Sequence, residues 1–530
     1  MNTASNILRI LIIVLIGVVV VAVLLMAAMV LIPAFSLFGV KFVSYAGSGS
    51  EPDQKIDIEV DSTEWKNAEA LVIETNGWGV EFRPFSNVGD TLYHVDGKSS
   101  VRVLFYSQYT GFVKVGEEGE KKAECNEEVY GKHQASGGLN ACIISTKEPD
   151  ALWITKSKAK MIVIYDKDAL GDRQVFITTN NGSVYLGSNS MEEKNRDVIN
   201  NDVNIISKSG KITVGNIDVT KSLNITKDGG DLDIKTNMSG NMVLSLNSGY
   251  GSINMKEVGT DGSQSGSASV NFKNIRNANI QFDAIYGDLQ YMTGNSGLIR
   301  GKKVTGSLIV NETKSCVFKV GSIGKDVTFN SDTGSLFASY VGGKVNKSTI
   351  SGNGQICIKA LEGTCEIESK NGRVALGENF KDSEATAFAG VKGNATVTTT
   401  GGDVYIKCAG RVELNVKSEK GFVQLDDVMG KVTYSVVDNG KSRVKATYKE
   451  LVGFNSYTTG SGSVEIYIPT SVPANLTWNS QKETDIEVSG LRTKEKTGTS
   501  KPINGASSSS GTLGISTVAG KITIKDAPSK

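Results

Sequence analysis

Histidine and proline are scarce in this chain, and neither sign of charge dominates. The 530 residues include 2 His and 8 Pro, with 57 Lys and Arg against 56 Asp and Glu. A nearly neutral total without a sustained basic run gives no electrostatic basis for nucleic-acid binding. His94 and His133 have no second ligand at metal-site spacing, and no nucleophile elbow, phosphate loop or zinc signature occurs. The sequence therefore predicts no catalytic, metal or cofactor site.

Glycine is abundant where proline is scarce. The chain has 59 Gly, and 39% of its residues are apolar while 21% are charged. This composition excludes a collagen-like or Pro-rich linker protein, and it is too apolar for a disordered chain. It favours a folded protein in which many tight turns join short strands.

The longest uncharged run lies near the N-terminus. No charged residue occurs from Ile10 to Val40, and the run Ile10–Ile32 is long enough for a helix to span a bilayer. The alternative is a cleaved signal peptide, but its apolar region would hold about 7 to 15 residues. We therefore predict a transmembrane helix at 10–32 in contact with the lipid bilayer, after a cytoplasmic tail at 1–9. Arg9 favours a single-pass cell-membrane protein with residues 41–530 outside the cytoplasm.

Irregularly spaced strand patterns follow the predicted helix. We expect a flexible linker at 33–55, which contains "GSGSEPD", and then a membrane-proximal β-rich cap region at 56–179. Repeat stacks need caps because exposed strand edges invite aggregation. At the other end, residues 469–530 are expected to form C-terminal coils and a cap, with a flexible loop near 491–512.

Residues 180–468 repeat one short pattern, in which glycine and a polar residue precede an aliphatic–any–aliphatic strand. Examples are "SGKITV" from Ser209 and "GGDVYI" from Gly401, and several intervals between such glycines are 18 to 21 residues. Alternation places pairs such as Val404 and Ile406 in one interior. A strand this short cannot bury its apolar face alone, but stacked copies bury it in one column.

This repetition predicts an all-β chain, a single-stranded β-helix or β-solenoid preceded by one transmembrane helix. The glycines would take positive-φ or crowded conformations at the corners between faces. A string of β-sandwiches is the alternative, because Asn-Gly between apolar alternations is also a hairpin signal. Sandwiches more usually bury large aromatic residues, whereas the repeated strands here are rich in Val, Ile and Leu.

The repeated "SGKITV", "NGSVYLG", "NGRVALG" and "GGDVYIKC", with the closing "GSVEIYIPTSVPANLTWNSQKETDIEVSG", resemble a known bacterial family. It is the putative-adhesin family, whose domains have no assigned function, and the resemblance covers roughly Leu71 to Asp526. The resemblance implies a right-handed β-helix that often follows a membrane anchor, and it implies no catalytic residues. The long middle array and the polar excursion at 116–138 depart from the compact members of that family.

Three tyrosines are candidate surface contacts. Alternation points Tyr185, Tyr405 and Tyr467 outward, near polar neighbours. Exposed tyrosines can stack on sugar rings or anchor a protein partner, and the alternative is isolated packing against neighbouring coils. The adjacent carboxylates Asp426 and Asp427 are expected on opposite faces of a strand and therefore not to form a catalytic pair.

Six cysteines divide between the cap region and the repeats. Cys125 and Cys142 flank the polar excursion and could form a disulfide in an extracytoplasmic domain, and the alternative is that all six are reduced thiols. Alternation predicts that the repeat cysteines Cys316, Cys365 and Cys408 point inward and that Cys357 points outward.

Two classes of function remain open. The first is a non-enzymatic, membrane-anchored extracytoplasmic surface protein, adhesin-like or a scaffold, whose partner is an envelope glycan or a surface protein. The second is a carbohydrate-active enzyme, a polysaccharide lyase or hydrolase, on the same β-helix scaffold. We favour the first, because the ionisable residues are periodic and form no convergent set in the sequence.

Overall fold

The computed structural model describes a nearly all-β chain that divides into two compact units. It describes residues 36–37, 40–44, 52, 54–85, 100–106, 109–114, 124–125, 129–147, 151–157, 159–187, 197–235, 237–246, 251–259, 270–436, 441–488 and 491–526. Unit 1 extends to Ile217, and unit 2 runs from Asp218 to Lys530. The described helices are short: α2 (Thr63–Asn67) and α3 (Lys167–Leu170).

Unit 1 contains two sets of parallel strands whose outer edges carry antiparallel strands. In the first set, β10 (Asn140–Lys147), β4 (Ala70–Thr75), β13 (Gln174–Thr179) and β16 (Asp202–Ser207) pair in that order. In the second set, the order is β12 (Lys160–Tyr165), β5 (Gly79–Pro84), β14 (Val184–Leu186) and β17 (Ile212–Val214). Antiparallel β8 (Glu124–Cys125) and β9 (Val129–Lys132) pair with β10, and β6 (Ser100–Tyr106) pairs with β12 and with β3 (Gln54–Glu59).

A small antiparallel sheet completes unit 1. It joins β1 (Ser36–Leu37), β2 (Val40–Ser44), β7 (Tyr109–Lys114) and β11 (Ala151–Ser157). The segment 33–55, expected to be a linker, therefore contains two paired strands. Two further short strands are β15 (Asp197–Ile199) and β18 (Ile217–Val219), the latter at the division between the units.

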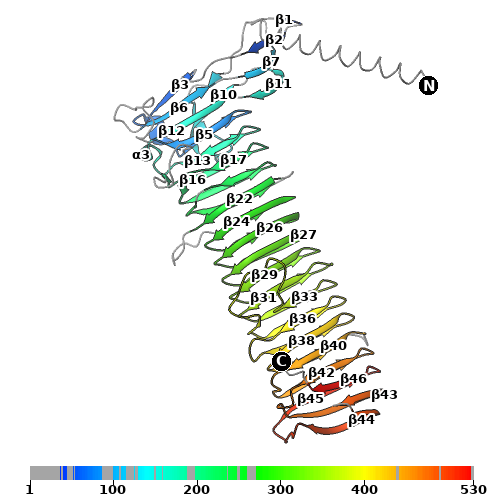
Figure 1. Cartoon of the computed structure of the whole chain (residues 1–530). Coiled ribbons are helices and arrows are strands. Elements are labelled where there is room, and N and C mark those ends of the chain that lie inside the picture. Colours follow the sequence, from blue (N-terminus) through cyan, green and yellow to red (C-terminus); the bar gives the residue numbers. More distant parts are fainter. Residues whose placement is uncertain are drawn as a thin grey trace, which may run out of the picture. The chain divides into compact units, whose positions relative to one another are not determined.

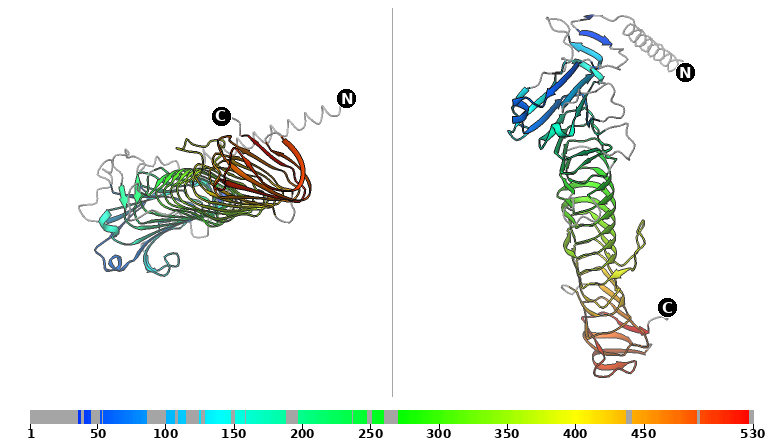
Figure 2. Two further views of the ribbon diagram at one scale, coloured as in Figure 1. Left: turned by 90° about the horizontal axis from the view of Figure 1, so that it is seen from below. Right: turned by 90° about the vertical axis from the view of Figure 1, so that its left-hand side faces the viewer.

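Unit 2 is built from two stacks of parallel strands, and the chain alternates between them (Figures 1 and 2). The first stack contains β19 (Ser222–Lys227), β21 (Asn241–Leu246), β23 (Val270–Lys273), β25 (Leu289–Tyr291), the first half of β27 (Leu308–Ile323), β28 (Val327–Ser331), β30 (Val345–Ile350), β32 (Cys365–Ser369), β35 (Ala395–Thr399), β37 (Glu413–Ser418), β39 (Lys431–Ser435), β41 (Phe454–Thr459) and β45 (Gly511–Thr517).

The second stack contains β20 (Leu232–Ile234), β22 (Gly251–Val258), β24 (Ala278–Ile285), β26 (Gly294–Val304), the second half of β27, β29 (Ser335–Val341), β31 (Ile356–Leu361), β33 (Val374–Leu376) with β34 (Gly390–Val391), β36 (Val404–Lys407), β38 (Phe422–Val428), β40 (Arg443–Tyr448), β42 (Val464–Ile468) and β46 (Ile522–Asp526). Equivalent residues of successive repeats are neighbours in both stacks, with register shifts in the pairings of β28 with β27 and with β30, of β30 with β32, and of β38 with β40.

The far end of unit 2 departs from chain order. Strands β45 and β46 pair with β41 and β42 on one side, and with β43 (Ala474–Val488) on the other. β44 (Leu491–Ile503) then pairs antiparallel with β43, from Val488 opposite Leu491 to Ala474 opposite Ile503. The segment 491–512, expected to contain a flexible loop, is therefore largely a strand at the edge of the stack.

The predicted strand alternation agrees with the burial of the repeats. Val404 and Ile406 are buried, and Tyr405 between them is half-buried. The interior is not as uniformly aliphatic as expected, because aromatic rings also lie inside unit 2. Edge-to-face contacts join Tyr291 to Phe318 at 5.1 Å and Phe318 to Phe329 at 5.7 Å between ring centroids.

The repeated glycine is required by close stacking of the corners. A methyl group added at Gly372 would overlap the carbonyl oxygen of Gly354, the equivalent corner one repeat earlier, and one at Gly402 would overlap that of Gly372. Neither Gly372 nor Gly402 has a positive φ. Of the two conformations predicted for these glycines, the crowded corner therefore applies here.

A buried hydroxyl group three residues before the glycine closes many of these corners. The Oγ1 atom of Thr399 accepts a hydrogen bond from the Gly402 N–H at 2.9 Å. Ser369 Oγ donates to the Gly372 carbonyl at 2.7 Å, and Thr459 makes the equivalent bond to Gly462 at 2.7 Å. The repeat is therefore Ser/Thr-x-x-Gly at the corner, followed by the short apolar strand.

The repeat cysteines are buried thiols, including one that was expected to face outward. Cys316, Cys365 and Cys408 point into the interior as predicted, but Cys357 is also only 4% exposed. Burial raises the pKa of the Cys357 thiol to about 11, with nearby Arg373 and Glu378 contributing opposing charge effects. The low exposure of Cys357 shows that the outward face of its strand is covered at this position, and Arg373 and Glu378 form an ion pair nearby, at the start of the insertion 377–389.

Candidate functional site

A groove on the outward face of the second stack brings together two of the three predicted tyrosines. It has a volume of about 300 Å³ and lies over strands β36, β38, β40 and β42. We call it the tyrosine groove, and its lining residues are Tyr405, Lys407, Asp426, Asp427, Lys445, Thr447 and Tyr467.

The strand register sets the spacing of the groove. Tyr405 lies opposite Gln424, Gln424 opposite Lys445, and Lys445 opposite Glu465 on the next strand. Tyr467 is two residues beyond Glu465 on the same face. The two tyrosines are therefore three strand steps apart, or about 14 Å along the stack.

Acidic side chains hold both tyrosine hydroxyl groups. Burial, together with the charge of Asp426 and a hydrogen bond to it, raises the pKa of Tyr405 to about 12. Gln424 also donates to the Asp426 carboxylate, at 2.9 Å. At the other end of the groove, the Tyr467 hydroxyl donates to Glu465 at 2.6 Å, and this hydrogen bond raises the pKa of Tyr467.

Basic side chains lie between the tyrosines. The Lys445 ammonium is 5.2 Å from the centroid of the Tyr467 ring, within the range of a cation–π interaction. Lys407 lies beside Tyr405 in the lining of the groove. The arrangement offers two aromatic rings with fixed hydroxyl groups, together with donors and acceptors of both charges, to an elongated polar ligand.

The two adjacent aspartates both line this groove, which corrects the expectation that they face opposite sides. The pairing of β38 with β40 shifts register between Leu425 and Val428, and Asp427 has a φ of 56°. This bulge breaks the strict alternation that the prediction assumed. The Asp427 carboxylate is 3.2 Å from Lys449 and 3.8 Å from Lys407.

Tyr185, the third predicted contact, lies in unit 1 and takes the alternative role of packing. It is half-buried on β14, and its hydroxyl lies where a side chain at Gly215 would be. Gly215 directly follows β17, the strand that pairs with β14. Tyr185 thus packs on the adjacent strand.

The structure does not bring Cys125 and Cys142 together. Cys125 lies opposite Thr146 on β10, four residues along that strand from Cys142. This separation is about 13 Å along the strand, whereas a disulfide needs Cα atoms closer than about 7 Å. Cys142 is buried.

Of the two histidines, His133 lies within the described residues. His133 Nε2 lies 2.8 Å from Glu74, and His94 lies outside the described residues. Among the residues that the structure describes, no group of three or more His, Cys, Asp or Glu could hold a metal ion.

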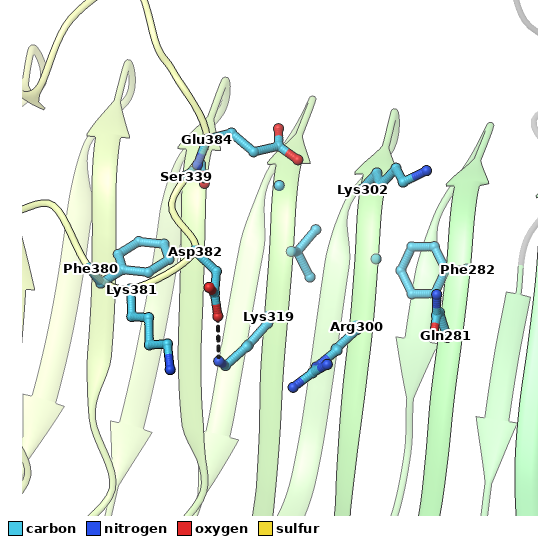
Figure 3. A pocket seen from close by; sticks show the side chains of 13 residues that line it. Gln281, Phe282, Arg300, Lys302, Lys319, Ser339, Phe380, Lys381, Asp382 and Glu384 are labelled. Carbon is cyan, nitrogen blue, oxygen red and sulfur yellow. Dashed lines mark hydrogen bonds and ion pairs between the residues drawn. The ribbon is translucent and has the colours of Figure 1, made fainter.

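A second hollow, which the sequence reasoning missed, lies beside the insertion 377–389 between β33 and β34 (Figure 3). We call it the basic pocket, because its charged lining residues are Arg300, Lys302, Lys319, Lys381, Asp382 and Glu384. The sequence signal was the long interval from Gly372 to Gly402, compared with the 18 residues from Gly354 to Gly372.

The predicted tail at 1–9 and transmembrane helix at 10–32 lie outside the described residues. Within the part of the chain that the structure does describe, no helix has the length and apolar character needed to cross a membrane.

Comparisons with known proteins identify no family. No family model and no curated protein matches the chain. A solved structure of a putative cell adhesion protein from Clostridium sporogenes is similar over 90% of this chain and 100% of that chain, with 9% identity and a TM-score of 0.14. A TM-score this low carries no argument about architecture or function. The strands of the chain itself make it a nearly all-β protein.

Proposed function

We propose that this chain is a non-enzymatic, membrane-anchored surface protein of the adhesin or scaffold kind, which binds an envelope glycan in the tyrosine groove. The observation that carries the proposal is the placement of Tyr405 and Tyr467 in one groove with hydrogen-bonding side chains between them. Tyrosine rings pack on the apolar faces of sugars, and the polar groups beside them select hydroxyl groups.

The proposal includes a β-solenoid fold for unit 2. Its support is the parallel, in-register pairing of each strand with the equivalent strand of the next repeat. A string of sandwiches would contain many antiparallel hairpins. In the described part of unit 2, β43 and β44 form an antiparallel pair, whereas the strands of the two stacks pair in parallel. A long stack presents shallow, extended faces, which suit a polymer better than a small molecule.

The length of the tyrosine groove favours a glycan chain over a single sugar as its ligand. Contacts spread over about 14 Å, from Tyr405 to Tyr467, require a ligand with several linked rings. Each ring contact contributes about 0.5–1.5 kcal/mol, so binding to one groove is expected to be weak and additive.

The test is retention of purified full-length protein, in detergent micelles, on immobilised neutral and acidic polysaccharides. We expect Tyr405→Ala and Tyr467→Ala each to weaken retention about 3- to 10-fold, and the double variant more. Tyr340→Ala, a partly exposed tyrosine on β29 outside the groove, is the matched control. Unchanged retention by the double variant would exclude the groove as the glycan site.

A carbohydrate-active enzyme is the second candidate, and one observation favours it. Asp426 and Asp427 lie in the same groove, as paired carboxylates do in glycoside hydrolases. However, Asp426 is hydrogen-bonded to Gln424 and Asp427 is paired with two lysines. The same retention assay should therefore release no oligosaccharide, and product formation that Asp426→Asn abolishes would establish the enzyme instead.

Membrane anchoring belongs to the proposal and rests on the uncharged run Ile10–Ile32. Arg9 before this run favours an extracytoplasmic location for the rest of the chain. Protease added to intact cells is expected to digest the region beyond Lys41. If this region is protected from protease in intact cells and digested only after lysis, it lies inside the cell.

A further inference from the structure

The basic pocket is held open by an insertion that is fixed to the second stack. The Phe380 ring packs on Phe337, with 5.6 Å between the centroids. The Glu384 N–H donates to Ser339 Oγ at 2.8 Å, and Lys359 Nζ donates to the Glu384 carbonyl at 2.7 Å. These contacts to β29 and β31 make the insertion one wall of a built hollow.

Glycine on the neighbouring strand lets this wall lie close to the sheet. A methyl group at Gly321 on β27 would overlap the Glu384 carboxylate and the backbone carbonyl of Lys302. The insertion therefore has a specific seat on β27 as well as on β29 and β31.

Positive charge converges on the pocket from three chain segments. Arg300 on β26 lies directly opposite Lys319 on β27, so two like charges occupy adjacent strands on one face. Such a pair is destabilising by itself. The insertion adds Lys381, and Figure 3 shows the side chains of Arg300, Lys319 and Lys381 on the same side of the crossing segment.

The acidic residues of the pocket do not neutralise this charge. Asp382 lies 3.3 Å from Lys319, while Lys302 is paired with Asp283 at 2.7 Å and also interacts with the charge of Glu384. Within the described part of the chain, Arg300 and Lys381 form no ion pair. Two cationic side chains thus remain to meet an anion.

The size of the pocket limits what it can hold. Its volume is about 250 Å³, slightly below the range of about 300 Å³ and more that is usual for whole small-molecule ligands. It suits one charged unit of a longer chain. A guanidinium can bind two oxygens of a carboxylate or sulfate at once, and the ammonium groups add less directional contacts.

The basic pocket and the tyrosine groove open on the same face of the second stack. Register partners lead from Lys319 through Phe337, Cys357 and Ala375 to Tyr405. Four strand steps therefore separate Lys319 from Tyr405, or about 19 Å. The insertion stands between the two sites, so each can hold its own segment of polymer.

We propose that the basic pocket binds an anionic group, a carboxylate or a sulfate, of an acidic polysaccharide through Arg300 and Lys381, beside the ion pair of Lys319 with Asp382. This inference deepens the proposed function by adding a second site that selects charge, and it rests on that function for the class of polymer. The tyrosine groove supplies affinity for sugar rings, and the basic pocket supplies preference for acidic chains.

The experiment compares binding of full-length protein, in detergent micelles, to dextran, dextran sulfate and polygalacturonate at 50 and 500 mM NaCl. We expect at least one of the two acidic polymers to bind about tenfold more tightly than dextran at low salt, and this preference to shrink at high salt because screening weakens exposed charge contacts. Tighter binding of dextran sulfate would identify sulfate, and tighter binding of polygalacturonate would identify carboxylate. If inorganic phosphate displaces the acidic polymer only at high concentration, this result supports binding of an anion that is carried by a polymer.

The decisive variant is R300Q/K381Q, since both residues are exposed and unpaired in the described chain. It is expected to lose about tenfold in affinity for the acidic polymer and to bind dextran as before. R411Q/K417Q makes the same charge change at exposed positions at and before β37 of the first stack, and it should keep the preference.

The outcomes separate this inference from the proposed function. Equal losses in the two double variants, or no preference for acidic polymers, would overturn the basic pocket while glycan binding by the groove still stands. If none of the three polymers bound and the Tyr405 and Tyr467 variants changed nothing, the proposed function itself would fail.

Discussion

The corner glycines allow a sharp test of the packing in unit 2. Gly372→Ala adds a single methyl group where the Gly354 carbonyl oxygen already lies. The matched control is Gly410→Ala, because a methyl group there would meet no atom closer than the Lys392 Cα at 4.0 Å. Both positions belong to unit 2, so the two variants differ mainly in the space available to the methyl group.

The expected cost follows from the bonds at that corner. To accept the methyl group, the corners must separate by on the order of 1 Å. Three hydrogen bonds between the two repeats would stretch: Asn371 N to Gly352 O at 3.2 Å, Lys370 N to Ile350 O at 2.9 Å, and Ile356 N to Arg373 O at 3.0 Å. At about 1 kcal/mol each, they amount to about 3 kcal/mol. Reduced freedom of the unfolded chain offsets about 0.4–1 kcal/mol of this loss.

Urea unfolding followed by far-ultraviolet circular dichroism measures the difference. We expect Gly372→Ala to lower the free energy of unfolding by about 2–3 kcal/mol, and Gly410→Ala to leave it unchanged or slightly raised. If the two variants agree within about 0.5 kcal/mol, corner stacking does not explain the glycine repeat.

Three further predictions concern the interior of unit 2. Thr399→Val removes the hydroxyl that bonds Gly402 and should cost about 1–2 kcal/mol in thermal unfolding, whereas an effect near zero would contradict a role for the corner hydroxyls. Val404→Asp buries an unpaired charge and should lower the free energy of unfolding by several kcal/mol. Asp403→Ser should lower it by about 1 kcal/mol, because Asp403 accepts a hydrogen bond from the Phe422 N–H at 2.8 Å. Similar losses of stability in the two variants would mean that the inward and outward residues of this strand are assigned wrongly. Burial raises the pKa of the Cys365 thiol to about 12, so alkylation at pH 9 should be slow in the folded protein and fast in urea. Stability from keeping this thiol neutral is fully present below about pH 9 and declines as the pH rises toward 12, and fast labelling of the folded protein would contradict its burial.

Regular parts of the chain were predictable because each residue's environment repeats. The alternation around Val404 and Ile406 specified their burial, since side chains on a strand alternate between two faces. Outward residues at Tyr405 and Tyr467 were also predictable one strand at a time. Their meeting in one groove was not, because it depends on the register across three strand steps.

Departures from regularity were not predictable from the pattern. The bulge at Asp427 breaks alternation, and a sequence gives no sign that one residue is added to a strand. The insertion 377–389 was visible as an irregular interval, but its seat on Gly321 and its cover over the face near Cys357 arise from tertiary contacts. The basic pocket depends on that insertion and was missed for the same reason.

The order of strands at the far end of unit 2 has a consequence for assembly. Up to β42, each new strand can add to an edge formed by chain already in place, so the stack can grow during synthesis. β43 and β44 cannot dock in their final place when they are made, because β45 and β46 lie between them and the preceding layer. The hairpin must wait until residues up to Asp526 have been synthesised, and the last layers then close together. Unravelling from the C-terminal residues would likewise require β45 and β46 to be withdrawn from between β43 and the layer of β41 and β42, so this order of strands opposes unravelling.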